Sequence, residues 1–165
     1  MLSLGIDPGT ARVGYGLVLE QGDGSLKAVA YGVITTPAGV PMAERLKMIH
    51  EQLAVLIQTY KPDRAGIEEL FFGKNVTTAI TVAQGRGAIL LTLAQAGLPI
   101  TEYKPNMIKQ SITGFGGAHK GQIQEMVRLL LNLDEIPHPD DAADGLAIAI
   151  TDLHNSQQIS LLGEE

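Results

Sequence analysis

Three short segments rich in apolar and β-branched residues open the chain, and they constrain its fold more than any other feature. Residues 2–7 form an apolar run that ends at a Pro-Gly pair, as expected of a buried strand that enters a turn. Residues 12–20 and 27–34 are also typical of strands, and the turn-forming stretch 22–24 lies between them. Three consecutive strands with short connections predict an antiparallel meander.

The remaining pattern alternates helices with two further strands. Apolar residues repeat at helical spacing after Pro41, so we expect a helix from there to about Tyr60, before Pro62. A strand over 64–70 then lies parallel to the first strand, because a βαβ crossover connects them. The later elements are expected at about 75–96 (helix), 99–103 (strand), 105–112, 119–131 and 140–154 (helices).

This order predicts an α/β fold with a mixed five-stranded sheet flanked by helices. We expect a single domain over residues 1–154 and a flexible C-terminal tail over 155–165, which is polar or acidic. The chain contains no cysteine, which excludes disulfides, thiolate zinc sites and cysteine nucleophiles. No signal peptide is expected, and no apolar run approaches the roughly 18 residues of a membrane span. We therefore expect a soluble, cytoplasmic protein.

Charge is unevenly distributed along the chain, although its net value is −6. Residues 103–128 carry four basic residues and one acid, a net charge of +3, whereas 129–165 carry eight acids and no Lys or Arg. A basic segment followed by an acidic one is compatible with a phosphate-binding face beside a metal-binding cluster. The alternative is a solvated surface followed by an acidic tail.

Two carboxylate positions lie at the ends of expected parallel strands. Asp7 ends the first strand, and an acid there is costly unless it is solvated, paired or bound to a metal. The carboxyl ends of strands are also where sites form in open α/β sheets. The alternative for Asp7 is a turn residue before Pro8. Glu68 and Glu69 both end the fourth strand, and alternation alone does not choose between them.

A third source of carboxylates opens the last helix, at Asp140, Asp141 and Asp144. Asp141 and Asp144 share a helix face, as do Asp140 and Asp144. Capping of the helix N-terminus explains one of these acids but not all three. Carboxylates from three separate elements suit Mg²⁺ or Mn²⁺ rather than zinc, and two such ions about 4 Å apart can promote phosphodiester hydrolysis.

Three motifs, in this order and at these intervals, resemble the bacterial RuvC Holliday-junction resolvases: GIDPGTARVGYGLV, GIEELFFGKN and DDAADGLAIAI. The likeness covers residues 2–154. It implies an RNase H-like fold, a homodimer, and magnesium-dependent nicking of two symmetric strands of a four-way DNA junction in recombination and repair. It also implies two Mg²⁺ ions per site, with Mn²⁺ able to substitute, and a branch-migration helicase as partner.

The resemblance further implies which acids bind metal and act in catalysis, namely Asp7, Glu68, Asp141 and Asp144. The family's Ile-Glu and Asp-Ala-Ala-Asp motifs favour Glu68 over Glu69 and Asp141 over Asp140. The chain departs from the pattern by the extra acid Asp140 and by Gly145, which costs the helix up to about 1 kcal/mol relative to Ala.

Lysines and aromatic residues complete the expected site. Lys109 and Lys120 occupy positions similar to the family's functional lysines, and Lys120 is expected to begin a helix, where backbone N–H groups favour phosphate. The resemblance points to Phe71 for stacking on an unpaired base, with Phe72 beside it, while Lys74 of the same loop and His119 can contact DNA. For each residue the alternative is an ordinary place in the core or on the surface.

Other functions are compatible with parts of the pattern. The Asp-Pro-Gly-Thr turn is similar to the phosphate-binding hairpin of actin-like and sugar kinases, but those enzymes need two such lobes, and 165 residues supply one. An RNase H-like nuclease that acts on RNA and a non-catalytic junction-binding module are closer alternatives. A binder of polyanions gains nothing from four clustered acids, which favours the nuclease.

Overall fold

A five-stranded mixed sheet forms the centre of the computed structural model, which describes residues 1–70 and 75–162. Its strand order is β3-β2-β1-β4-β5; β1 pairs antiparallel to β2 and parallel to β4, and β4 pairs parallel to β5. The strands are β1 (Leu2–Asp7), β2 (Arg12–Glu20), β3 (Leu26–Thr35), β4 (Arg64–Glu68) and β5 (Ile100–Tyr103). The predicted meander and crossover are therefore confirmed.

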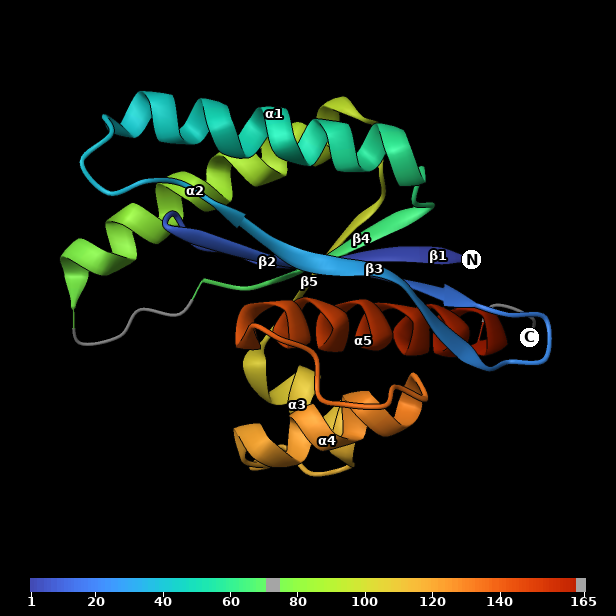
Figure 1. Ribbon diagram of the computed structural model, residues 1–165. Coiled ribbons are helices and arrows are strands. Elements are labelled where there is room, and N and C mark those ends of the chain that lie inside the picture. Colours follow the sequence, from blue (N-terminus) through green and yellow to red (C-terminus); the bar gives the residue numbers. More distant parts are fainter. Residues whose placement is uncertain (71–74, 163–165) are drawn as a thin grey trace.

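Helices cover both faces of this sheet (Figure 1). The pair α1 and α2 lies on one face, and α5 crosses the other face with α3 and α4 packed beyond it. The helices are α1 (Met42–Tyr60), α2 (Val76–Gln95), α3 (Pro105–Thr113), α4 (Lys120–Leu130) and α5 (Asp140–Leu162). Two apolar cores result: Ile49, Leu53 and Ile89 belong to the first, and Val127 and Leu146 to the second.

The last helix is longer than the sequence pattern predicted. It was expected to end near residue 154, but α5 continues to Leu162. Residues 155–162 contain neither glycine nor proline, so nothing in the backbone stops the helix there, and Ser156 is buried. Polar composition alone was therefore a poor indicator of where the helix ends.

One described helix, α2, bears on the expectation that no apolar run approaches the length of a membrane span. By length and composition α2 is long and apolar enough to cross a membrane, with a mean hydropathy of 1.3 over its best window. Its inner face packs in the core, where Ile89 and Leu93 are fully buried. A core helix meets the same criterion, so one such helix is weak evidence for a membrane span.

The packing of α5 on the sheet depends on glycines that allow backbones to touch. A Cβ atom at Gly5 would lie 2.1 Å from the carbonyl oxygen of Gly145, and a Cβ at Gly145 would lie 2.5 Å from the carbonyl carbon of Tyr15. Gly145 therefore has a packing role that outweighs its poor helix propensity. This close approach brings the N-terminal turns of α5 to the end of β1.

Candidate active site

Two carboxylates meet where the parallel strands β1 and β4 end. Ile6 pairs with Ile67 in the sheet register, so the next residues, Asp7 and Glu68, lie side by side. The two carboxylates are therefore close enough for each to affect the pKa of the other. Burial, followed by the charges of Asp144, Glu68 and Asp141, raises the pKa of Asp7 to about 8. Burial also raises the pKa of Glu68.

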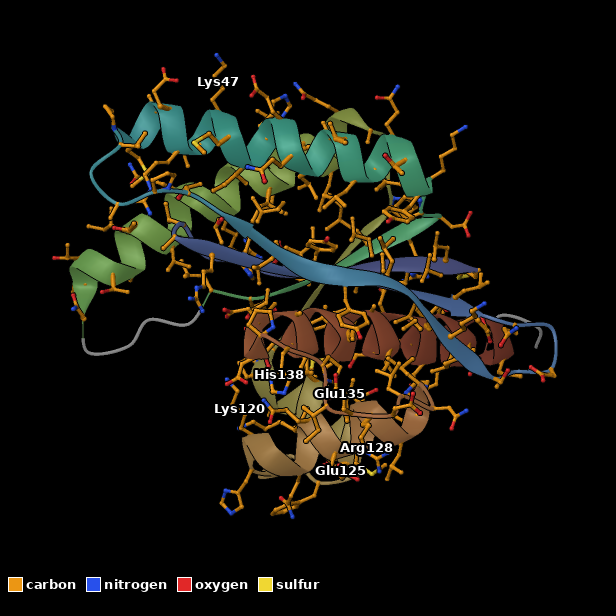
Figure 2. The ribbon with its side chains drawn as sticks, in the orientation of Figure 1. Lys47, Lys120, Glu125, Arg128, Glu135 and His138 are labelled. Carbon is orange, nitrogen blue, oxygen red and sulfur yellow. The ribbon has the colours of Figure 1, made fainter. Side chains whose placement is uncertain are left out.

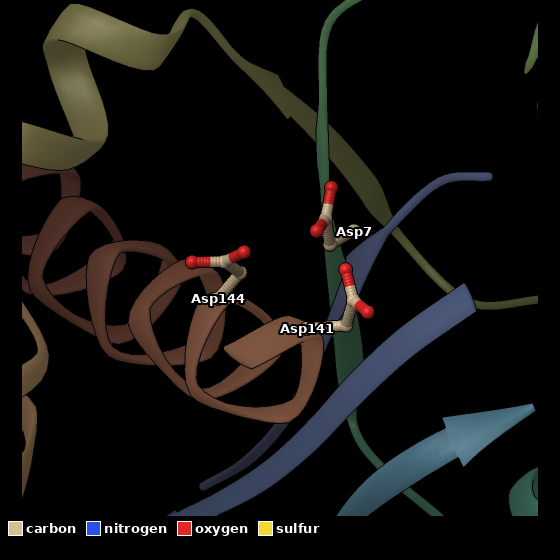
Figure 3. Close-up of side chains that lie close together, drawn as sticks. All are labelled: Asp7, Asp141 and Asp144. Carbon is tan, nitrogen blue, oxygen red and sulfur yellow. The ribbon is translucent and has the colours of Figure 1, made fainter. Parts of the chain in front are cut away.

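The first two turns of α5 bring two further acids to this point. One carboxylate oxygen from each of Asp7, Asp141 and Asp144 lies within 4.8 Å of the others (Figure 3). Burial raises the pKa of Asp144, although the charge of Lys120 opposes this. Acids on a strand and on a helix, far apart in sequence, thus form one cluster that can jointly bind a cation.

Glu68 and Glu69 have different surroundings. Glu68 lies beside Asp7 and lines a cavity of about 240 Å³ together with Asp144, Lys109 and Lys120. Glu69 donates its backbone N–H to the carbonyl of Tyr103, 2.8 Å away; it lines only a second hollow beside α2, which Glu68 also borders. The geometry therefore associates Glu68 with the acidic cluster.

Lys120 begins α4, as predicted, and points toward the start of α5 (Figure 2). Its Nζ lies 3.1 Å from Oδ2 of Asp140 and 3.9 Å from Oδ2 of Asp144. The hydrogen bond with Asp140 raises the pKa of Lys120 and lowers that of Asp140. Asp140, which the sequence left as an extra acid, is thus the ion-pair partner that holds Lys120 beside the cluster.

Lys109 approaches the same cavity from α3. It lines the cavity with Glu68, and its charge lowers the pKa of that acid in opposition to the larger effect of burial. Two ammonium groups from two helices therefore flank the carboxylates, which is the arrangement the basic segment suggested.

Two arginines near the site were missed by the sequence reasoning. Arg12 Nη1 lies 3.8 Å from Asp141 Oδ2 and is largely exposed. Arg86 Nε donates to the carbonyl of Glu68 at 3.4 Å, while its Nη2 lies 3.0 Å from Glu102. The position of Arg12, directly after the Asp-Pro-Gly-Thr turn, was an available signal; for Arg86 the sequence offered none.

The predicted DNA-contacting residues have different outcomes. His119 is exposed at the N-terminus of α4, where its backbone N–H donates to the side chain of Gln122 at 2.9 Å. Phe71, Phe72 and Lys74 lie outside the described residues. The aromatic ring of Phe115, which the sequence analysis did not single out, is 64% exposed in the loop before α4.

Together, the mixed sheet and the acidic cluster define an RNase H-like domain with a site of the kind that binds divalent metal ions. Residues 3–152 match the family model described as crossover junction endodeoxyribonuclease RuvC. The RuvC of Chloroflexus aggregans is 54% identical over 99% of this chain and 99% of the relative. That of Roseiflexus sp. is 56% identical over 98% of this chain and 96% of the relative.

Solved structures agree with these matches. The Thermus thermophilus RuvC structure has a TM-score of 0.89 at 34% identity and covers 96% of both chains. A structure of T. thermophilus RuvC in complex with Holliday junction substrate has a TM-score of 0.88 at 31% identity, again over 96% of both chains. The chain belongs to the RuvC family of crossover junction endodeoxyribonucleases, and the predicted resemblance and fold are confirmed.

Proposed function

We propose that this chain resolves four-way (Holliday) DNA junctions in recombination and repair, by metal-dependent hydrolytic nicking of two symmetric strands. The observation that carries the proposal is the convergence of Asp7, Asp141 and Asp144 to within 4.8 Å at the end of β1, in a chain of the RuvC family. A RuvC relative in complex with a Holliday junction substrate supports the choice of DNA.

The donor atoms fit Mg²⁺, with Mn²⁺ able to substitute. Carboxylate oxygens are the ligands these hard cations prefer. Burial and mutual repulsion raise the pKa of Asp7 to about 8, so a cation would stabilise the ionised cluster. We assign the ligands to Asp7, Glu68, Asp141 and Asp144, with two ions per site. Bound there, these ions supply Lewis acidity at the scissile phosphate.

The lysines complement the acids. Lys120 and Lys109 line the cavity beside Glu68 and Asp144, so their ammonium groups can stabilise negative charge that develops on the phosphate during cleavage. Asp140 keeps Lys120 at this place through the 3.1 Å ion pair. A phosphate entering between α3 and α4 would meet positive charge before it reaches the carboxylates.

Further parts of the proposal rest on the family and the sequence. Two symmetric nicks need two sites, and we therefore propose a homodimer, which works with a branch-migration helicase as a soluble protein of the cytoplasm. Phe71 is proposed to stack on an unpaired base at the junction, with Phe72, Lys74, Lys109, His119 and Lys120 contacting DNA. Loss of one base–aromatic stack costs about 1–3 kcal/mol, so Phe71→Ala should reduce junction nicking roughly tenfold or more.

The deciding experiment is strand nicking of a synthetic four-way junction, with a linear duplex and an RNA–DNA hybrid as control substrates. Wild type, Asp7→Asn and the control Glu51→Gln are compared in Mg²⁺, in Mn²⁺ and in chelator. Glu51 is an exposed acid on α1, across the sheet from α5, so its replacement should change nothing.

We expect paired, metal-dependent nicks in the junction alone, abolished by Asp7→Asn while junction binding persists. Binding without nicks in either metal would instead make the protein a junction-binding module. Cutting of the RNA hybrid in preference to the junction would move it to the RNA-processing nucleases.

A further inference from the structure

A buried carboxylate lies on α5 about two turns beyond the acidic cluster. Asp152 is fully buried, yet it belongs to the same helix as Asp141 and Asp144. A buried charge is costly unless it is paired and hydrogen-bonded. Its partners therefore indicate what it contributes.

Four hydrogen bonds reach Asp152, and they come from three different strands. Ser3 Oγ of β1 donates to Oδ2 at 2.7 Å, and the Tyr103 hydroxyl of β5 donates to Oδ1 at 2.7 Å. Arg64 of β4 donates through Nε to Oδ2 at 2.6 Å and through Nη2 to Oδ1 at 2.9 Å. Burial, and then the bond to Asp152, raises the pKa of Tyr103 to about 12, so this hydroxyl remains a donor.

Two of these strands also carry the acids of the cluster, on the same face. Side chains alternate along a strand, so Ser3 shares a face with Asp7, and Arg64 shares a face with Glu68. Strand β1 thus meets α5 twice, through Ser3 at one end and through Asp7 at the other, and β4 carries Arg64 and Glu68 in the same arrangement.

The spacings along strand and helix match. Four residues from Ser3 to Asp7 span about 13 Å of strand. Eight residues from Asp144 to Asp152 span about 12 Å of helix. The two elements run in opposite directions, so pairing Asp152 with Ser3 sets Asp144 opposite Asp7.

Between these two anchor points, β1 contacts α5 through the backbone of Gly5. Gly5 lies against the backbone of Gly145 and Ala149, so β1 presents no side chain at this point that could fix the helix along its axis. Close contact between small residues holds the helix against the sheet, but it does little to stop the helix from sliding along its own axis. Fixed hydrogen bonds at one end can supply the missing specificity, which is one role that buried ion pairs have in some proteins.

We propose that Asp152 is a positioning residue that fixes the axial register of α5 on the sheet, and thereby the spacing between Asp7 and the acids of α5. The role rests on the proposed metal-dependent function, because the acids must meet at one cation. Asp152 acts through this register alone; it lies too far along α5 to touch the cation.

The test variant is Asp152→Leu combined with Arg64→Met, which removes both charges together and fills most of the volume. Replacing a whole buried ion pair by apolar residues is often neutral for stability, whereas removing one partner is not. Thr92→Val is the matched control. Thr92 is buried on α2 in the opposite layer, with its hydroxyl 2.8 Å from Nδ1 of His50, and it is remote from α5.

Mn²⁺ binding to the protein without DNA is measured by calorimetry, and junction nicking is measured against metal concentration. We expect the double variant to raise the Mn²⁺ dissociation constant and the metal midpoint of nicking by about tenfold, as loss of a supporting partner does at metal sites. Thr92→Val should leave the Mn²⁺ dissociation constant and the metal midpoint of nicking unchanged, even if it lowers the melting temperature as much as the double variant does.

If the double variant and Thr92→Val change Mn²⁺ binding and nicking equally at the same stability, the proposal is overturned. Ser3→Ala removes one bond and no charge, and we expect it to raise the Mn²⁺ dissociation constant in the same direction but less. If the double variant does not fold, an unchanged Mn²⁺ affinity of Ser3→Ala overturns the proposal instead. A wild type that binds Mn²⁺ without nicking would overturn the proposed function and leave the calorimetry to decide the role of Asp152.

Discussion

Replacing Asp7 by Asn should stabilise the metal-free protein while it abolishes nicking. Burial and three neighbouring acids raise the pKa of Asp7 from 3.8 to about 8. Between these two values the folded state holds a proton that the unfolded state has released. The wild type therefore loses stability as pH rises through this window, and an amide at position 7 has no proton to lose.

The magnitude follows from the size of the shift. One proton of difference changes the free energy of unfolding by about 1.4 kcal/mol per pH unit. Between pH 5 and pH 8 the full effect is about 4 kcal/mol, and side-chain rotation with water entry reduces it to about 2 kcal/mol. For a domain of this size that corresponds to about 4–8 °C in melting temperature.

Thermal unfolding of wild type and Asp7→Asn is measured in chelator from pH 5 to pH 8, with Glu51→Gln as the control. We expect the advantage of Asp7→Asn to grow with pH, and added Mg²⁺ to reduce or reverse it, because the cation stabilises the folded state that binds it. Parallel pH profiles of the two proteins, or a less stable Asp7→Asn at pH 8, would refute the reasoning.

Three further changes test other parts of the site. Lys120→Ala should reduce nicking about 100-fold, because it removes a group that stabilises transition-state charge. The melting temperature should stay almost unchanged, because the ion pair with Asp140 is mostly exposed. A nicking rate equal to that of wild type would show that Lys120 has no role in catalysis. Gly14→Ala places a Cβ atom 1.9 Å from the carbonyl oxygen of Asp141, so chemical denaturation should show a free energy of unfolding lower by about 3 kcal/mol or more. A variant as stable as wild type would contradict the close packing of α5 on the sheet. Chelation should stop nicking but retain junction binding in a gel-shift assay, and Mn²⁺ should restore the nicks; nicking that persists in chelator would exclude the metal site.

Most of the fold was predictable because local patterns and tertiary packing agree. Residues 2–7 were expected as a strand and form one, and Pro41 and Pro62 bracket α1 as expected. The C-terminal end of α5 was not predictable by the same means. Its last turns contain polar residues, and polarity resembles a frayed tail unless the burial of Ser156 is known.

The choice between Glu68 and Glu69 shows which information the sequence does not contain at the end of a strand. Alternation divides a strand into two faces but does not say which face a later helix will cover. Small residues carry part of that information: Gly5 shares a face with Asp7, and Gly66 shares a face with Glu68, and α5 lies against both glycines. A search for glycines of the same parity as the acid would have favoured Glu68 without any family resemblance.

The acidic C-terminal segment also shows why the net charge alone is a poor guide to what the chain binds. Its acids have different partners in the fold. Asp144 belongs to the acidic cluster, Asp140 pairs with Lys120, and Asp152 is buried against Arg64, 88 residues away. Partners so distant in sequence leave no mark on a local charge sum. Acids that are paired or that bind metal repel a phosphate little. The net charge of −6 therefore does not describe the electrostatic field that a DNA phosphate would meet between α3 and α4. An acidic protein can therefore bind a polyanion at a site whose acids are paired with lysines or, as proposed above, with bound metal ions.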